Sequence, residues 1–425
     1  MSILVKGATI VTQDASRSVV RGDILVRGSR IEQVGRNLSG EAERVIDASG
    51  KIAIPGLVNA HTHVGMTILR GYGEDLPLHD WLHDKIWPAE ARQGAEDAGI
   101  AARLAFCEMM RGGTTSFAEM CIHDPKFIFE AAGEAGMRGI VARGLLDFRT
   151  EGFTRRVLSE VEKSLGYGRG IVRPSVAAHA PYTCSEELML KTKEIAKARG
   201  LKFQMHAGET RKEVFQVQGW TGKYPFDYLD SIGLMDRDSI FAHGGWLTKK
   251  EMALAGSRGA SIASCPISNL KLATGGICQI AELDRAGANV CLGTDGAASN
   301  NSLDMFQTMK MASLLQKHHY WKADAISAQR ILDFATLGGA AALGFECGSI
   351  EAGKLADIVL LERGPNMCPE NSLVANLVYS AGPQNVSDVI IDGKLVMENR
   401  KILTLDEKKV MEEASKAASG ILAGQ

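Results

Sequence analysis

Pro55-Gly-Leu-Val-Asn-Ala-His-Thr-His63 is the most informative stretch of this sequence of 425 residues. An apolar run from Ile52 to Val58 leads into two histidines that are separated by one residue. Alternate residues of a β-strand point to the same face, so His61 and His63 can direct their imidazoles at one ion. The pattern is typical of half of a first-row metal site at the end of a buried strand. Among ten histidines the spacing also arises by chance, so the rest of the sequence has to decide.

The composition is that of an ordinary globular protein, with 45% apolar and 23% charged residues. The net charge is -2 with both signs interspersed, which gives no electrostatic footprint for nucleic acid or an anionic membrane. No apolar run approaches the roughly eighteen residues of a membrane span, and the start, Met-Ser-Ile-Leu-Val-Lys-Gly, does not resemble a signal peptide. The eight cysteines are scattered without a Cys-x-x-Cys pair, which indicates reduced, buried thiols. We therefore expect a cytoplasmic protein of enzyme size.

Both ends of the chain consist of short strand-like segments between turns. Residues 3–11 and 22–34 near the start, and 356–361 and 388–396 near the end, are rich in β-branched residues. The Asp392-Gly393 pair is a strong signal for a two-residue hairpin turn. We expect residues 1–54 and 350–425 to form one small β-sandwich domain from both termini, with a helical tail over about residues 405–418.

The middle of the chain alternates between strand-like and helix-period segments. Helix periodicity is found at 98–111, 125–135, 185–199 and 249–256. The eight strand-like runs are 56–60, 115–118, 139–143, 172–178, 202–205, 239–242, 260–264 and 289–293. Eight strands alternating with helices predict an α/β fold, a (β/α)₈ TIM-type barrel over residues 55–349. A doubly wound open sheet is the runner-up, but no Gly-x-Gly-x-x-Gly follows the first strand.

The ends of the predicted strands carry polar residues that a barrel brings onto one axis. In chain order they are His61 and His63, Glu119, Arg143, His179, His206 and Glu209, His243, Ser264 and Cys265, and Asp295. Chemistry in such barrels takes place at the carboxyl ends of the strands. Five of the ten histidines fall at these positions, which favours a metal site over chance.

Several motifs identify a family. The first stretch, His206-Ala-Gly-Glu209, His243-Gly and Gly293-Thr-Asp-Gly296 resemble the amidohydrolase superfamily. The chain is more closely similar to the methylthioadenosine/S-adenosylhomocysteine deaminase group, which includes the 5'-deoxyadenosine deaminases, over essentially its whole length. The motifs that carry this likeness are Met66-Thr-Ile-Leu-Arg-Gly-Tyr72, Trp81-Leu-x-x-Lys-Ile-Trp-Pro-x-Glu90, Ala178-His-Ala-Pro-Tyr-Thr-Cys184 and Ser268-Asn-Leu-Lys-Leu-Ala273.

The resemblance implies one divalent metal ion, held by His61, His63, His206 and Asp295. Mixed nitrogen and oxygen ligands favour Zn²⁺, and Fe²⁺ is compatible with them. The ion would lower the pKa of a water molecule to roughly 7. Without the resemblance, the sequence is also compatible with a core histidine whose hydrogen bonds are satisfied at His206, and with a helix N-cap at Asp295.

The resemblance also assigns the remaining catalytic roles. Glu209 is the general acid and base that moves a proton from water to N1 of the purine. His243 orients or polarises the water, and Asp295 doubles as a proton acceptor. Attack at C6 then expels ammonia. Without the resemblance, Glu209 is also compatible with a solvated glutamate at the start of a loop.

The resemblance also implies substrate contacts for Glu209 and Asp295 and for several further positions. Glu90 matches a position that accepts hydrogen bonds from the ribose hydroxyls, and His179 one that contacts the nucleoside. Arg143 matches a position near the 5' substituent, where a guanidinium can hold a carboxylate. Trp81 covers the base or the 5' group, or is a plain core residue. The sequence does not decide whether Arg149, Arg155 or Arg156 joins Arg143.

We therefore expect a zinc-dependent hydrolase that acts on C–N bonds of cyclic amidines. Its small-molecule substrates would be 5'-deoxyadenosine, 5'-methylthioadenosine and S-adenosylhomocysteine, with adenosine as a further candidate, and its products inosine analogues and ammonia. The alternatives at the same mononuclear site are a triazine-type chlorohydrolase or aminohydrolase and a guanine-type base deaminase. Related barrels often form homo-oligomers. The sequence leaves open the preferred 5' substituent, the native metal and the oligomeric state.

Other functional classes fit less well. Binuclear cyclic-amide hydrolases need a lysine at the end of the fourth strand, and none lies beside His179. The cytidine-deaminase fold requires His-x-Glu followed by Pro-Cys-x-x-Cys, which is absent. An inactive scaffold would be expected to lack metal ligands, and all four are present.

Overall fold

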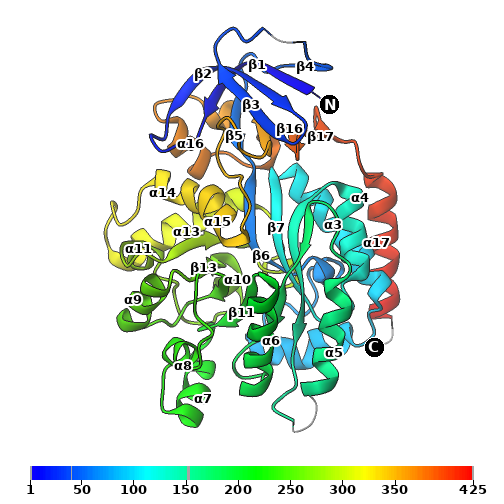
Figure 1. Ribbon diagram of the computed structural model, residues 1–425, viewed down its shortest axis with the longest axis vertical. Helices are drawn as coiled ribbons and strands as arrows, with labels where there is room; N and C mark the ends of the chain where they lie inside the picture. Colours follow the sequence, from blue (N-terminus) through cyan, green and yellow to red (C-terminus); the bar gives the residue numbers. More distant parts are fainter. Residues whose placement is uncertain (1, 40, 151–153, 424–425) are drawn as a thin grey trace.

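The computed structural model describes residues 2–39, 41–150 and 154–423, apart from the side chain of Arg155. Two nine-stranded sheets organise these residues (Figure 1). One sheet is built from strands near both ends of the chain, and the other from strands of the middle. The first sheet lies at the end of the second where strand β6 (Leu57–Thr62) begins, directly after β5 (Ile52–Pro55) of the first.

The terminal sheet has the order β18-β17-β16-β15-β5-β1-β2-β3, with β4 parallel to β1. Its other strands are β1 (Ser2–Val11), β2 (Val19–Arg27), β3 (Arg30–Gly35), β4 (Arg44–Asp47), β15 (Ile358–Leu361), β16 (Val386–Ile391), β17 (Lys394–Glu398) and β18 (Lys401–Ile402). Aliphatic side chains from both ends of the chain, such as Ile24 and Ile358, share one core. The predicted hairpin at Asp392-Gly393 is confirmed: it joins β16 to β17, and both residues have positive φ.

The second sheet is a barrel in which every pairing is parallel. Its strands after β6 are β7 (Thr114–Cys121), β8 (Arg138–Leu145), β9 (Val172–Pro174), β10 (Val176–Ala178), β11 (Phe203–Ala207), β12 (Ser239–His243), β13 (Ser261–Ser264) and β14 (Asn289–Leu292). The sequence predicts one strand over 172–178, and the structure divides it at Ser175. Pro174 lacks the backbone N–H that a continuous ladder needs, which accounts for the break.

Side chains and backbone close the barrel between its first and last strands. Asn59 of β6 donates to the Thr294 hydroxyl (2.7 Å) and accepts from the Thr294 N–H (3.0 Å). The N–H of Asp295 donates to the carbonyl of His61 at 3.0 Å. Gly293 permits this approach, since a Cβ there would lie 2.8 Å from the His61 carbonyl oxygen. The closure therefore places the end of β14 against the first histidine of the opening motif.

Helices surround the barrel (Figure 1). They are α1 (Leu78–Trp81), α2 (Trp87–Glu90), α3 (Ala95–Arg111), α4 (Lys126–Ala135), α5 (Thr154–Leu165), α6 (Glu186–Arg199), α7 (Arg211–Thr221), α8 (Pro225–Ser231), α9 (Lys249–Arg258), α10 (Pro266–Lys271), α11 (Ile280–Arg285), α12 (Ala297–Asn300), α13 (Met305–Tyr320), α14 (Ala328–Asp333) and α15 (Gly339–Leu343). A 3₁₀ turn, η1 (Val64–Leu69), follows the opening motif, and π-helical turns occur at η2 (Leu82–Ile86) and η3 (Phe334–Gly338).

The end of the chain returns to the barrel. After α16 (Leu373–Tyr379) and the short 3₁₀ turns η4 (Pro365–Met367) and η5 (Pro383–Asn385), the last helix α17 (Glu407–Leu422) packs on α3. The helix therefore begins and ends later than the predicted tail of 405–418. It begins after Asp406 because the carboxylate of this residue caps the first turn by accepting the Lys409 N–H.

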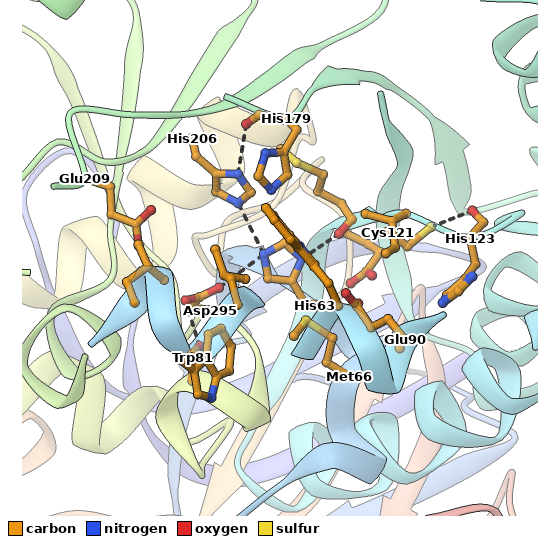
Figure 2. Close-up of a pocket in the computed structure, with 18 of the residues that line it drawn as sticks. His63, Met66, Trp81, Glu90, Cys121, His123, His179, His206, Glu209 and Asp295 are labelled. Atoms are coloured by element: carbon orange, nitrogen blue, oxygen red, sulfur yellow. Dashed lines mark hydrogen bonds and ion pairs between the residues drawn. The ribbon is translucent and has the colours of Figure 1, made fainter. Parts of the chain in front are cut away.

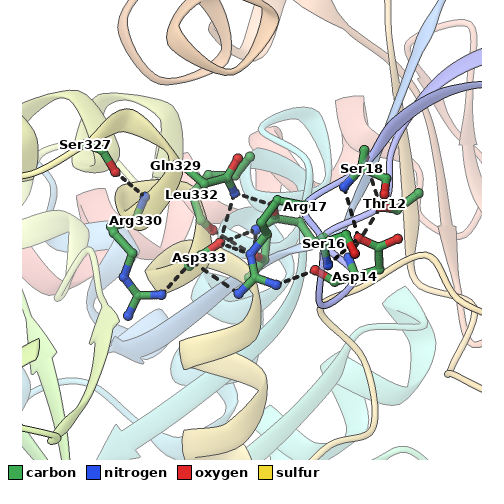
Figure 3. Close-up of polar contacts among 12 residues, drawn as sticks. Thr12, Asp14, Ser16, Arg17, Ser18, Ser327, Gln329, Arg330, Leu332 and Asp333 are labelled. Carbon is green, nitrogen blue, oxygen red and sulfur yellow. Dashed lines mark hydrogen bonds and ion pairs between the residues drawn. The ribbon is translucent and has the colours of Figure 1, made fainter.

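Charged groups connect the terminal sheet to the barrel. Arg138 at the start of β8 forms a buried ion pair with Asp357 (2.7 Å) beside β15, and a second one with Asp392 (2.9 Å). On another side, Arg17 in the β1–β2 loop binds Asp333 at the end of α14 at 2.8 Å (Figure 3). The predicted fold class is confirmed; the domain division at 54/55 and 349/350 stays a prediction.

The structure bears on two expectations from the sequence, one about membrane spans and one about the cysteines. Among the described residues, no helix is long and apolar enough to cross a membrane. The eight cysteines are free, as predicted from their spacing, and seven of them are buried. Cys368 is exposed, so the prediction of burial was wrong for that residue.

Candidate metal centre and active site

Three imidazoles converge at the carboxyl ends of the barrel strands. His61 and His63 come from the end of β6 and His206 from β11, and one ring nitrogen of each lies within 4.8 Å of the others. All three rings are largely or fully buried. Strand periodicity directs both histidines of the His-x-His motif inward, because residues two apart share a face. The barrel then supplies the third ring from the opposite side.

Hydrogen bonds fix which nitrogen of two of the rings faces the centre. Nδ1 of His63 donates to the carbonyl of Met120 (2.5 Å), and Nδ1 of His206 donates to the carbonyl of His179 (2.9 Å). Both Nε2 atoms are therefore left with lone pairs, and they face each other at 3.2 Å. Nε2 of His61 is buried and has no hydrogen-bond partner among the described residues. Two lone pairs that face each other beside a third unpartnered ring nitrogen are unfavourable unless a cation lies between them, so these residues fit a metal ion.

Asp295 completes the centre with a carboxylate. Its Oδ1 lies 3.2 Å from Nε2 of His63 and 3.5 Å from Nε2 of His61 (Figure 2). Its Oδ2 accepts hydrogen bonds from the hydroxyls of Ser268 (2.6 Å) and Ser299 (2.7 Å). Asp295 has a φ of 63°, a strained conformation that the surrounding contacts stabilise.

Glu209 and His243 face each other beside this centre. Oε1 of Glu209 lies 3.7 Å from Nε2 of His243, and both residues are buried. Burial raises the pKa of Glu209 well above its usual value, and the charges of Asp295 and Glu213 add to the effect. Asn269 donates to Nδ1 of His243 at 3.1 Å, which leaves the ring proton on Nε2. The pair therefore places a carboxyl whose protonated form is favoured, and an N–H donor, next to the metal centre.

Glu213 holds the loop between His206 and Glu209. Its carboxylate accepts the N–H of Gly208 (2.8 Å) and the N–H of Glu209 (2.9 Å). The chain turns at Gly208, which has a φ of 64° and so occupies the conformation that favours glycine. Glu213 is completely buried on the first turn of α7. It thus fixes the backbone that carries the Glu209 side chain.

A cavity opens from the metal centre. It encloses about 790 Å³, part of it open to solvent, which is within the range of small-molecule sites. Its walls include Trp81, Glu90 and His179 (Figure 2). Burial raises the pKa of Glu90 to about 7, although His63 opposes the shift. His179 donates from Nδ1 to the Thr183 hydroxyl (2.8 Å), which leaves Nε2 as an acceptor. Trp81 is 4% exposed and is both a wall of the cavity and a core residue.

The predicted arginines lie outside this cavity. Arg143 pairs with Glu160 at 2.5 Å and lines an adjoining cavity of about 710 Å³, together with Arg156. Arg149 donates to the carbonyl of Pro181 (2.8 Å), and its guanidinium lies 4.0 Å from the centre of the Trp220 ring. The Arg155 side chain lies outside the described residues. The structure therefore brings Arg143 and Arg156 together but not with the metal centre.

Sequence reasoning missed several supporting residues. Ser268 and Asn269 belong to a motif that carried the family likeness, yet their bonds to Asp295 and His243 were not foreseen. Ser299 and Glu213 gave no recognised signal, although each lies four residues after a predicted site residue and so about one helical turn away. Glu119 stood at a strand end without a role; its Oε2 accepts the Val64 N–H at 2.7 Å.

Known proteins resemble the chain over most of its length. Residues 52–396 match the model of the amidohydrolase family. The chain is 40% identical to a 5'-deoxyadenosine deaminase of Methanosphaera stadtmanae over 423 residues, 98% of each chain. It is also 40% identical to a 5-methylthioadenosine/S-adenosylhomocysteine deaminase of Pelotomaculum thermopropionicum over 427 residues, again 98% of each.

Solved structures show the same architecture. A zinc-bound adenosine deaminase from Xanthomonas campestris superposes with a TM-score of 0.95 at 33% identity, covering 99% of this chain and 98% of the other. Zinc-bound atrazine chlorohydrolase TrzN from Arthrobacter aurescens superposes with a TM-score of 0.91 at 24% identity, covering 98% of this chain and 100% of the other. The second likeness indicates the fold alone.

Proposed function

The chain belongs to the amidohydrolase family, and we propose that it is a hydrolytic deaminase of 5'-modified adenosines. Its substrates are 5'-deoxyadenosine, 5'-methylthioadenosine and S-adenosylhomocysteine, with adenosine as a further candidate. The names of the relatives at 40% identity support this substrate class. The observation that carries the proposal is a buried carboxyl, Glu209, beside three converging imidazoles in a cavity of nucleoside size.

We assign one divalent ion, Zn²⁺ in preference to Fe²⁺, to His61, His63, His206 and Asp295. The unpartnered imidazole nitrogens and the neighbouring carboxylate support this set. Imidazole and carboxylate ligands suit zinc. When bound, such an ion lowers the pKa of a water molecule and so makes hydroxide available at neutral pH.

The residues of the chain supply the proton transfers. Glu209 gives its proton to N1 of the adenine, which makes C6 electrophilic. His243 orients the attacking water through Nε2–H, and Asp295 accepts a proton from that water. A C6–O bond forms, the C6–N6 bond breaks after N6 receives this proton, and the proton that remains on the C6 oxygen returns to Glu209 as the C6=O bond forms. The nucleoside and one water thus become the inosine analogue and one ammonia.

Further residues would hold the nucleoside. We assign the ribose hydroxyls to Glu90, which lies in the cavity wall, and contacts with the base to His179 and Trp81. Arg143 remains our candidate for a carboxylate on the 5' substituent. Its ion pair with Glu160 must open for that purpose, whereas a hydrogen or methylthio group makes no such demand. We therefore expect 5'-deoxyadenosine and 5'-methylthioadenosine to be better substrates than S-adenosylhomocysteine.

The location and assembly of the protein stay predictions. The charge pattern indicates no nucleic-acid partner, and we expect a cytoplasmic enzyme. A homo-oligomer is expected from the behaviour of related barrels, and light scattering of the purified protein would measure it.

The proposal is tested by ammonia release from metal-loaded protein in parallel reactions. The compounds are 5'-deoxyadenosine, 5'-methylthioadenosine, S-adenosylhomocysteine, adenosine, guanine and a chlorotriazine. Turnover of the 5'-modified adenosines is the expected result. If no nucleoside released ammonia while the triazine released chloride or guanine released ammonia, the deaminase assignment would be overturned and the metal site would stay intact.

A further inference from the structure

The segment around the end of β7 forms part of the cavity wall, on the side away from Glu209 in Figure 2. Cys121, the last residue of β7, and Ile122 and His123 after it line the same cavity as Glu209. Figure 2 shows Glu209 at one side of the cavity and His123 at the other, with Glu90 on the side of His123. The cavity therefore runs from the metal centre past Glu90 to His123.

His123 carries an unsatisfied polar atom in this wall. Its Nε2 is buried and has no hydrogen-bond partner among the described residues. Burial and the nearby charge of Arg143 lower the pKa of the ring, so it is neutral at pH 7. A neutral imidazole can either donate or accept a hydrogen bond, depending on its tautomer. Leaving such an atom buried without a partner is unfavourable, which indicates a ligand group at this position.

The residues next to His123 connect it to two cavities. The residues just before it in the chain, Cys121 and Ile122, line the cavity with weakly polar and apolar side chains. Ile122 also lines the adjoining cavity that contains Arg143 and Glu160. Arg143 is engaged by Glu160 there. His123 therefore directly follows the residue that the nucleoside cavity and the arginine cavity share.

The length of the substrate determines what reaches His123. Deamination requires C6 of the adenine beside Glu209 and Asp295. The ribose then extends toward Glu90, and its 5' carbon, the part of the nucleoside remote from the amino group, points to the far wall. We propose that His123 is a specificity-determining residue, whose Nε2 forms a hydrogen bond with a polar 5' substituent such as the hydroxyl of adenosine. This inference rests on the proposed deaminase function.

The consequence is a ranking of substrates by the 5' group. A 5'-hydroxyl can exchange a hydrogen bond with His123, whereas the 5'-hydrogen of 5'-deoxyadenosine cannot. The test compares kcat/KM for these two substrates in the metal-loaded wild type, His123→Phe, His123→Gln and Ile122→Leu. Phenylalanine keeps a ring without a polar atom, and glutamine keeps a polar group at a similar reach. Ile122→Leu is the matched control, since it alters shape in the same wall without altering polarity.

His123→Phe is expected to lower kcat/KM for adenosine about tenfold relative to 5'-deoxyadenosine, the size of one neutral hydrogen bond. His123→Gln should retain most of the adenosine activity, and Ile122→Leu should affect both substrates alike. An equal loss for both substrates in His123→Phe would make His123 structural and overturn the proposal. An unchanged ratio would also overturn it. A wild type that deaminates neither nucleoside would instead refute the proposed function itself.

Discussion

Glu209 is the residue on which the chemistry depends. Its carboxyl is buried beside His243, and burial keeps its pKa well above the usual value. The raised pKa favours the protonated form as the pH approaches neutrality, and a general acid needs that form in order to protonate the purine. An exposed glutamate would be ionised at this pH and could not serve as the donor.

Replacing the Glu209 carboxyl with an amide tests its role. Glu209→Gln should keep metal bound and lose turnover by about 10²–10⁴, because an amide cannot deliver a proton. The measurements are kcat on 5'-deoxyadenosine and metal content per chain. Glu187→Gln, on an exposed glutamate of α6, is the control. Retention of more than about a tenth of the rate would remove Glu209 from the proton-transfer role.

Glu213 should act through Glu209. In Glu213→Gln, the amide NH₂ would face one of the backbone N–H groups that the carboxylate now accepts. We expect kcat to fall about tenfold or more with little change in KM, because the loop loses a buried hydrogen bond. Glu251→Gln is a matched control: Glu251 is equally buried and accepts the N–H groups of Phe226 and Thr248 outside the active-site cavity.

Steady-state kinetics measures kcat and KM of both variants, and thermal melting measures their stability. Glu251→Gln should lower stability without a specific loss of kcat. Equal kinetic effects of the two substitutions would show that Glu213 is only a structural residue.

Among the secondary-structure elements, α14 and the β1–β2 loop form a polar junction between the two sheets (Figure 3). Asp333 at the end of α14 binds Arg17 at 2.8 Å and Arg330 at 2.6 Å, and accepts from Gln13 at 3.0 Å. Burial opposes ionisation, but these donors lower the pKa of Asp333 below its ordinary 3.8. The carboxylate therefore stabilises the fold above that pH, and the contribution is lost as the pH falls through the lowered value.

Asp333→Asn should reveal this junction through the pH dependence of stability. At pH 7 the variant should lose about 1–3 kcal/mol of unfolding free energy, the value of charged hydrogen bonds. The difference from the wild type should shrink as the pH is lowered below about 4, where Asp333 of the unfolded chain takes up a proton, and disappear once the folded carboxyl is protonated too. Urea unfolding at several pH values measures it, with the exposed Asp324→Asn as the control. A pH-independent difference would contradict the account.

At the scale of the whole molecule, the metal centre joins strands from opposite sides of the barrel. His63, directly after β6, and His206 of β11 face each other with unshared electron pairs. Removing the ion with a chelator should abolish turnover and lower Tm, because only the folded chain assembles the site. Added Zn²⁺ should restore both, and Mg²⁺, which prefers oxygen ligands, should not. Full activity at less than about a tenth of an ion per chain would be incompatible with this reaction.

Much of this architecture could be predicted from the sequence, because its signals are local. The eight barrel strands are short apolar runs, and the polar residues at their ends define an active face once the barrel is assumed. The His-x-His spacing of His61 and His63 is likewise visible in the sequence itself. The split terminal sheet was recognisable because strand-like segments occur at both ends and Asp392-Gly393 marks a hairpin.

The remainder depends on contacts between distant residues. Arg143 lies at a strand end as predicted, but Glu160, from the following helix, directs its guanidinium into the adjoining cavity. Ser268 reaches Asp295 only because the barrel places the segment after β13 beside the end of β14. The break at Ser175 reflects the missing N–H of Pro174, a local signal that the apolar pattern concealed.

One measurement addresses the central claim most directly: mass spectrometry of the products from 5'-deoxyadenosine and metal-loaded protein in ¹⁸O-labelled water. The account predicts 5'-deoxyinosine with one labelled oxygen at C6 and one ammonia per nucleoside. Recovery of unchanged 5'-deoxyadenosine, or of free adenine released by cleavage at the ribose, would contradict hydrolytic deamination at C6.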